Sequence, residues 1–229
     1  MDALILAGGF GTRLAAVVPD LPKPMAPVCG RPFLELLLGA LRSKGLRRAV
    51  LSLGYRAEQV VRHFGPRFGD LELLYEIEDQ PLGTGGAMRR GLTRCQGPAA
   101  LVVNGDTLLD LDLQALWARW ADLQKPLLVA CEVPDTTRYG RLDIQHGRLT
   151  GFTEKGQPGP GWINSGHYVL PVGLLQDPAL PAAFSFESDF LVPRLPTLDV
   201  ALFHCHGPFI DIGVPEDYER AQTELARWT

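Results

Sequence analysis

The chain has 229 residues, a formal net charge of −4 at pH 7 and 46% hydrophobic residues. This length suits one domain with a full core, and the weak acidity argues against a nucleic-acid partner, whose phosphates need clustered basic residues. No apolar run approaches the roughly 18 residues of a membrane span, no signal peptide opens the chain and the four cysteines show no paired spacing, so we expect a cytoplasmic protein without a membrane partner.

The first predicted element is a buried strand that leads directly into a glycine-rich loop. Residues 4–7 are apolar and partly β-branched, and the glycines that follow let backbone N–H groups approach a ligand closely. Arg13 comes next, and Lys23 stands between two prolines ten residues later. A guanidinium can bind phosphate oxygens through two hydrogen bonds, and an ammonium acts as a point charge. The stretch therefore predicts a binding site for a polyphosphate.

Strands and helices alternate through the rest of the first half of the chain, and the second half is less regular. We expect further strands at residues 49–53, 71–77, 99–103, 127–133, 141–144, 149–153, 162–170 and 200–204. We expect helices at residues 33–41, 57–64, 87–94, 111–123, 171–175, 184–195 and from Pro215 onward. Such alternation predicts an α/β fold, with a mostly parallel central sheet and helices on both faces. Ligands of such sheets bind at the carboxyl ends of the strands, where we find the candidate turns 8–13, 81–86 and 104–106.

Residues 8–14, followed by residues 22–25, closely resemble the signature of the sugar-phosphate nucleotidyltransferases. A Walker loop would need Gly-Lys-Ser/Thr at its end, and a dinucleotide fingerprint would need a third glycine where Leu14 stands. The family joins a nucleoside triphosphate to a sugar 1-phosphate and releases pyrophosphate. The resemblance implies a Rossmann-like nucleotidyltransferase fold in a single domain over residues 1–229, with a nucleotide-binding part at about 1–110 and a small sugar-binding lobe at about 111–229.

The reaction of this family is an in-line attack of a phosphate oxygen on the α-phosphorus of the triphosphate, so it needs alignment and charge neutralisation. By resemblance, Arg13 and Lys23 are the catalytic residues that hold the phosphates, and Asp106 and Asp211 are the ligands of a Mg²⁺ cofactor. Taken alone, Asp106 would be interpreted as part of a turn and Asp211 as a helix cap. The two aspartates lie in motifs that follow each other in the family's order.

The same resemblance implies the substrate contacts. Nucleotide contacts are expected from Leu6, Ala7, Gly8, Gly9, Gly11, Thr12, Arg13, Glu78, Pro81, Gly83, Thr84, Asn104 and Gly105. Sugar-phosphate contacts are expected from Tyr139, Gly140, Glu154, Lys155 and Asn164. The family often has proline after its Glu-Lys pair, whereas this chain has Gly156. Without the other motifs, the pair would be interpreted as a surface ion pair.

Glu78 indicates the choice of base. It lies five residues before Gly83, at the position from which the family's loop reaches the base. Guanine presents two adjacent donors, N1–H and N2–H₂, and a carboxylate supplies two acceptors at matching spacing. Uracil and thymine present one donor between acceptors, which an amide would match better. We therefore expect GTP as the nucleotide.

Within the family, residues 8–14, 81–87, 138–140 and 209–218 together look most like the motifs of the D-glycero-α-D-manno-heptose 1-phosphate guanylyltransferases. Mannose 1-phosphate guanylyltransferases and the uridylyl- or thymidylyltransferases of the family remain alternatives, and a homodimer stays open. A non-catalytic nucleotide-sugar sensor on the same fold is the alternative from another functional class. An oxidoreductase with a dinucleotide cofactor is disfavoured by the missing third glycine.

Overall fold

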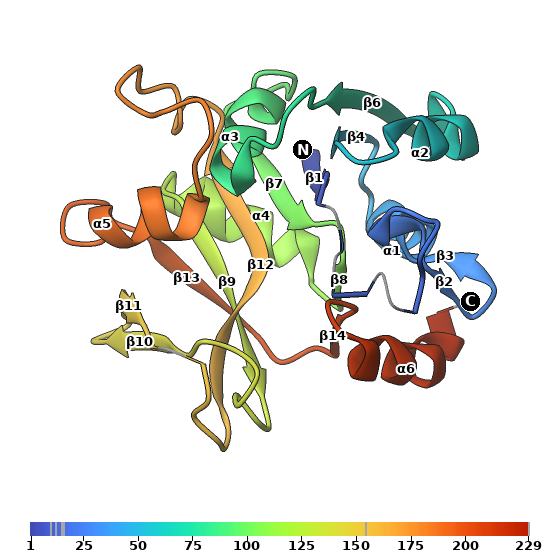
Figure 1. Ribbon diagram of the computed structural model, residues 1–229. Helices are drawn as coiled ribbons and strands as arrows, with labels where there is room; N and C mark the ends of the chain where they lie inside the picture. The colour runs from blue at the N-terminus through green and yellow to red at the C-terminus, as the bar shows by residue number, and fades with distance from the viewer. Residues whose placement is uncertain (10, 12, 15–16, 154, 229) are drawn as a thin grey trace.

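The computed structural model describes residues 1–228 except 10, 12, 15, 16 and 154. Its centre is an eight-stranded sheet in the order β13-β9-β12-β7-β1-β4-β6-β5 (Figure 1). Its strands are β1 (Asp2–Ala7), β4 (Arg48–Leu53), β5 (Arg67–Phe68), β6 (Leu71–Ile77), β7 (Ala99–Asn104), β9 (Leu127–Val133), β12 (Gly161–Pro171) and β13 (Ala201–Cys205). Strands β12 and β5 run antiparallel to their neighbours and the others run parallel. The predicted mostly parallel sheet is therefore confirmed.

Helices cover both faces of this sheet, as the apolar periodicity predicts. One core cluster contains the buried sides of α1 (Phe33–Ser43), α2 (Ala57–Phe64) and α4 (Leu113–Leu123), and the other contains those of α3 (Gly83–Leu92) and the π-helix η2 (Phe186–Leu191). Along β1, Ile5 belongs to the first cluster and Leu4 to the second, because successive strand side chains point to opposite faces. No helix in the described part of the chain is long and apolar enough to cross a bilayer.

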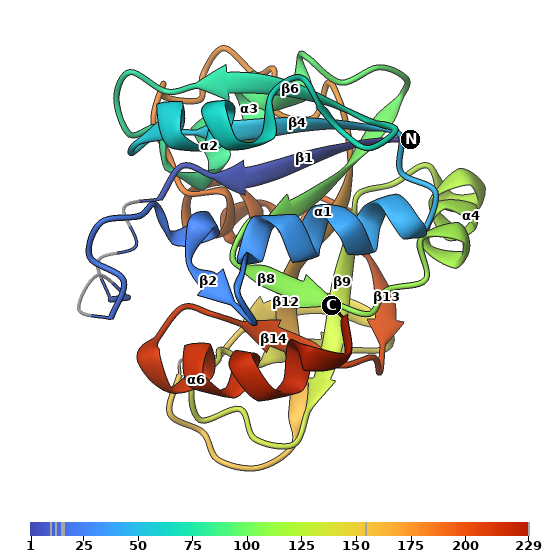
Figure 2. The same cartoon turned by 90° about the vertical axis from the view of Figure 1, so that its right-hand side faces the viewer.

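Three two-stranded ribbons extend the sheet. They are β8 (Thr107–Leu109) with β14 (Phe209–Asp211), β10 (Leu142–Gln145) with β11 (Arg148–Phe152), and β2 (Pro27–Val28) with β3 (Arg31–Pro32). The helix α6 (Pro215–Glu224) starts at the predicted proline and packs against β14 and β2, near the C-terminus (Figure 2). The remaining short helices are η1 (Lys23–Met25), α5 (Val192–Arg194) and η3 (Leu225–Trp228).

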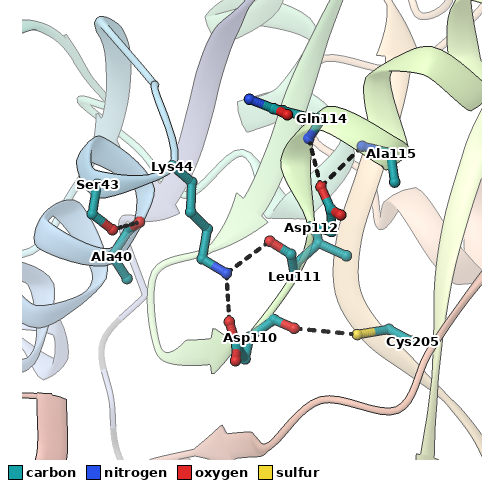
Figure 3. Close-up of polar contacts among 9 residues, drawn as sticks. All are labelled: Ala40, Ser43, Lys44, Asp110, Leu111, Asp112, Gln114, Ala115 and Cys205. Atoms are coloured by element: carbon teal, nitrogen blue, oxygen red, sulfur yellow. Dashed lines mark hydrogen bonds and ion pairs between the residues drawn. The ribbon is translucent and has the colours of Figure 1, made fainter.

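A polar cluster ties the end of α1 to the segment between β8 and α4 (Figure 3). The Lys44 ammonium donates to the Asp110 carboxylate and, at 2.9 Å, to the Leu111 carbonyl. The Cys205 thiol donates to the Asp110 carbonyl at 3.6 Å, which links this segment to β13. Asp112 caps α4 by accepting two backbone N–H groups at 3.0 Å. These bonds hold β8, and with it the turn that precedes β8, against the main sheet.

Two predicted helix boundaries are wrong. Helix α3 starts at Gly83 and not at residue 87, although glycine has a low helix propensity. The reason is tertiary packing: a Cβ on Gly85 would lie 2.2 Å from the Phe184 ring, so the first turn of α3 needs glycine to approach that segment. Pro171 is the last residue of β12, and residues 172–175 form turns instead of the expected short helix. The helix predicted at 184–195 is present as η2 followed by α5, with Ser185 as its N-cap.

Candidate functional site

A cavity of about 330 Å³ opens at the carboxyl ends of β1, β4, β6 and β7. Its lining includes many of the residues expected from the sequence: Leu6, Ala7, Gly8, Gly9, Lys23, Glu78, Pro81, Gly83, Thr84, Asn104, Gly105 and Asp106. Pro24, Ser52 and Ala87 also line it and were not predicted. The three glycine-rich or acidic turns therefore meet at one site, as the topology of a parallel sheet requires.

The glycine-rich loop packs directly against Lys23. Gly11 has φ +60°, and a Cβ there would lie 2.9 Å from the Cβ of Lys23, so both the backbone conformation and the contact favour glycine. Leu14 is fully buried and anchors the end of the loop. Arg13 is exposed and does not line the cavity. Thr12 lies outside the described residues.

Asp106 and Asp211 come together through the ribbon of β8 and β14. Thr107 and Asp211 are paired in the antiparallel register, and the Ile212 N–H donates to the Asp106 carbonyl at 3.0 Å. The Lys23 ammonium forms an ion pair with the Asp106 carboxylate. Burial and the neighbouring charge of Asp106 raise the pKa of the Asp211 carboxyl, and Lys23 opposes this shift. The site thus concentrates two carboxylates and one ammonium at the carboxyl end of β7.

This donor set fits a magnesium ion. Mg²⁺ is commonly held by one or two carboxylates together with substrate phosphates and water. No group of three or more His, Cys, Asp or Glu side chains with metal-binding geometry occurs among the described residues. Burial, and after it the nearby charge of Asp106, raise the pKa of Asp211, and a bound cation would relieve the repulsion between the two carboxylates.

Glu78 is held in place at the opposite end of the cavity. Its Oε1 accepts the Ser52 hydroxyl at 2.9 Å, and its Oε2 accepts the Leu82 N–H at 3.1 Å. A Cβ on Gly8 would lie 3.2 Å from the same Oε1, so the first loop leaves room for the carboxylate. Ser52 is fully buried near the carboxyl end of β4. A lone hydroxyl in an apolar strand, close to the ligand-binding edge, is the sequence signal that could have identified it.

The predicted sugar-phosphate residues that the structure describes, Tyr139, Gly140, Lys155 and Asn164, are not among the residues that line this cavity. Tyr139 packs edge-on against Phe209, with ring centroids 5.7 Å apart, and burial raises the pKa of its phenol to about 12. The next residue, Gly140, approaches the strand segment after β11, since a Cβ there would lie 2.8 Å from the Thr153 carbonyl oxygen. Lys155 is exposed. Of these residues, Tyr139 lies beside β14, and the charge of Asp211 also acts on its phenol.

Asn164 and Glu154 are the other two residues that the sequence predicts to contact the sugar phosphate. The Asn164 side chain donates to the Tyr168 hydroxyl at 2.6 Å and to Glu187 Oε1 at 2.5 Å. Glu154 lies outside the described residues. Arg138, next to Tyr139, pairs at 2.5 Å with the buried carboxylate of Asp217 on α6, which ties this loop to the helix that supports β14.

Known proteins match this chain over its full length. A family model described as Nucleotidyl transferase matches residues 2–227. The D-glycero-alpha-D-manno-heptose 1-phosphate guanylyltransferase of Aneurinibacillus thermoaerophilus is 37% identical over 229 residues, which are 100% of each chain. A protein of that name from Campylobacter jejuni subsp. jejuni serotype O:2 is 39% identical over 219 residues, 95% of this chain and 97% of the other.

Solved structures agree with the sequence relatives. The crystal structure of HddC from Yersinia pseudotuberculosis superposes with a TM-score of 0.88 at 39% identity, covering 98% of this chain and 99% of the other. The structure of the same protein complexed with GMP-PN gives a TM-score of 0.87 at 38% identity, with the same coverage. The predicted α/β fold, with its Rossmann-like sheet, is confirmed by these similarities.

Proposed function

The chain belongs to the nucleotidyl transferase family, and we propose that it joins GTP to a sugar 1-phosphate to give a GDP-sugar and pyrophosphate. The observation that carries this proposal is the layout of one cavity, in which the anchored carboxylate of Glu78 follows β6 and Asp106, paired with Lys23, follows β7, with β1 and β4 between those strands. A nucleotide needs hydrogen-bond acceptors for the guanine base at one part of the site, and positive charge and a metal ligand for the phosphates at another.

The first step assigned to the protein is to bind and align the nucleotide. Gly8, Gly9 and Gly11 offer backbone N–H groups to the phosphates, and Lys23 and Arg13 neutralise their charge. The attacking oxygen belongs to the sugar phosphate, so no nucleophilic side chain is required. Lys23 is a partly buried cation beside Asp106 at the edge of the cavity, and its charge would stabilise the transition state.

Asp106 and Asp211 would hold Mg²⁺. When bound, the ion would supply positive charge that neutralises the charge developing on the phosphates. The residues themselves supply the alignment, because β8 and β14 fix both aspartates through backbone pairing. Lys23, which pairs with Asp106 in this structure, would bind the phosphates of the nucleotide.

Glu78 would select guanine. Each of its oxygens already accepts one protein hydrogen bond, and a carboxylate oxygen has two acceptor sites. The remaining sites can accept the adjacent N1–H and N2–H₂ donors of guanine. ATP and UTP lack this pair of adjacent donors, so the site would bind them less tightly.

D-glycero-α-D-manno-heptose 1-phosphate is the sugar substrate that we propose. Support comes from the relatives of that name, which match this chain along nearly their whole length, whereas a mannose-1-phosphate guanylyltransferase of Mycobacterium tuberculosis is 30% identical with 65% of its length covered. Tyr139, Gly140 and Lys155 would contact the sugar phosphate, and Asn164 would support that subsite through the side chains it bonds. Residues 1–110 then form the nucleotide part of a single domain and residues 111–229 its sugar part.

Pyrophosphate release tests this proposal. Wild-type protein with Mg²⁺ should release pyrophosphate from GTP only when the sugar 1-phosphate is present, and Lys23→Met and Asp106→Asn should each lower kcat at least a hundredfold. Lys125→Met is the matched control, because Lys125 is an exposed lysine paired with an exposed aspartate far from the cavity. Absence of turnover with every triphosphate and sugar phosphate, together with retained GTP binding, would favour the sensor alternative instead.

A further inference from the structure

Asn164 has little hydrogen-bonding capacity left for a ligand. Its amide nitrogen donates to the Tyr168 hydroxyl at 2.6 Å and to Glu187 Oε1 at 2.5 Å, and its amide oxygen accepts the Gly166 N–H at 3.0 Å. Both amide hydrogens are thus used inside the protein. The Tyr168 hydroxyl also donates to Glu187 Oε1, at 3.0 Å. These contacts converge on one oxygen of one carboxylate.

The carboxylate of Glu187 faces solvent with its second oxygen open. Glu187 is exposed, and in the described part of the chain the hydrogen bonds to its side chain all end on Oε1. Tyr168 is almost fully buried, and burial raises the pKa of its phenol well above the usual value. The phenol therefore stays a neutral donor. The network fixes the direction of the carboxylate and leaves Oε2 available as an acceptor.

Glu187 lies where the two parts of the substrate site adjoin. The preceding residue, Phe186, donates its backbone N–H at 2.9 Å to the hydroxyl of Thr84, which lines the nucleotide cavity. On the other side, a Cβ on Gly166 would lie 2.3 Å from the amide nitrogen of Asn104, another lining residue. The segment that carries Glu187 comes just before α5, between α3 and the β10–β11 ribbon (Figure 1).

Packing of the π-helix η2 against the core does not by itself explain why Asn164 and Tyr168 both donate hydrogen bonds to Glu187. Phe186 and Phe190 are buried, stack with their centroids 5.7 Å apart, and already anchor the helix in the core. Ser185 caps its first turn through the Ser188 N–H at 3.2 Å. An exposed carboxylate that a buried phenol and an amide hold in one direction adds little to this anchoring. π-Helices are rare and occur frequently at functional sites.

We propose that Glu187 binds hydroxyl groups of the sugar 1-phosphate, and that Asn164 and Tyr168 are the positioning residues that hold its carboxylate. This inference rests on the proposed function and adds a sugar-binding residue to it. A carboxylate can accept hydrogen bonds from two neighbouring hydroxyls, and such charge-assisted bonds are stronger than neutral ones. A site built to bond a hydroxyl strongly disfavours an analogue that lacks it. Glu187 would therefore contribute to the choice of sugar and not of base.

The test is the Glu187→Gln variant, which keeps shape and removes charge. The KM for the sugar 1-phosphate should rise about tenfold, while the KM for GTP and the kcat at saturation stay within twofold of wild type. Tyr168→Phe should give a smaller rise in the same direction. Sugar 1-phosphates that lack single hydroxyls should identify one hydroxyl whose removal weakens binding to the wild type but not to Glu187→Gln. Glu132→Gln, which alters an exposed carboxylate bonded to His206 on the neighbouring strands, is the control.

The possible results distinguish a failure of the role proposed for Glu187 from a failure of the proposed function. An unchanged KM for the sugar phosphate in Glu187→Gln, with normal wild-type turnover, would overturn the role of Glu187 alone. Equal rises in the KM of GTP and of the sugar phosphate would also overturn it, because a merely structural residue would act on both. Absence of wild-type turnover with all sugar phosphates would overturn the proposed function and this inference with it.

Discussion

Removal of the Ser52 hydroxyl tests how the protein selects its base. Ser52 is fully buried in β4, and its hydroxyl donates to Glu78 Oε1 at 2.9 Å. Ser52→Ala deletes that donor and adds no volume. The Leu82 N–H still holds the other oxygen at 3.1 Å. The carboxylate should therefore keep its place but lose its fixed direction, and guanine should be bound less well.

The size of the effect follows from the type of bond. A hydrogen bond to a charged group contributes about 1.5–3 kcal/mol. Because Glu78 borders an open cavity, water can replace the lost donor, so the lower end of the range applies. About 1.4 kcal/mol corresponds to a tenfold change in an equilibrium constant. We expect kcat/KM for GTP to fall about tenfold, with kcat/KM for UTP changed much less.

Steady-state kinetics with GTP, ATP and UTP at a fixed sugar phosphate measure this discrimination. Ser165→Ala is the matched control, because Ser165 is also a buried strand serine whose hydroxyl donates to a carbonyl, that of Val129, at 2.8 Å. Both variants should lose similar stability. An unaltered preference for GTP in Ser52→Ala, or the same change in both variants, would refute the reasoning about Glu78.

Two further predictions concern stability. Gly85→Ala should lower the free energy of unfolding by about 2 kcal/mol through overpacking, because the new Cβ would meet the Phe184 ring at 2.2 Å; Gly39→Ala, in α1 with open space around it, should raise it, and equal urea midpoints would contradict this. Burial lowers the pKa of His167 from 6.5 to about 4, so the unfolded chain binds more protons between these values and stability should fall as the pH drops from 6.5 to 4. The loss should reach at most about 3 kcal/mol, and urea unfolding of His167→Asn should show a weaker pH dependence than the wild type; equal dependence would exclude His167 as the cause.

Sequence patterns correctly predicted the helices and strands whose first and last residues are determined by their neighbours in the chain. The helix at 57–64 and the strand at 71–77 have the expected bounds, because Gly65 ends the helix and apolar residues fill the strand. The start of α3 was missed because glycine usually marks a turn. Its helical start depends on contact with Phe184, about a hundred residues away, which no local pattern contains.

In the candidate site, too, some residues could be predicted from sequence motifs, and others could be found only from the folded structure. The glycine loop, Lys23 and Glu78 carry recognisable motifs, and the cavity brings them together. The closeness of Asp106 and Asp211 depends on two three-residue strands far apart in the chain, which pair Thr107 with Asp211, so it could be expected only by resemblance. Ser52 and Glu187 act through contacts that exist only in the folded protein.

A competition experiment tests the central claim most directly. Equal concentrations of GTP, ATP, UTP and dTTP are incubated with Mg²⁺, the manno-heptose 1-phosphate and the wild-type protein, and the products are identified by mass spectrometry. We expect the mass of the GDP-heptose to dominate, and Asp106→Asn to produce none of it. A dominant UDP- or dTDP-sugar would contradict the role assigned to Glu78, and the absence of any nucleoside diphosphate sugar would contradict the proposed activity itself.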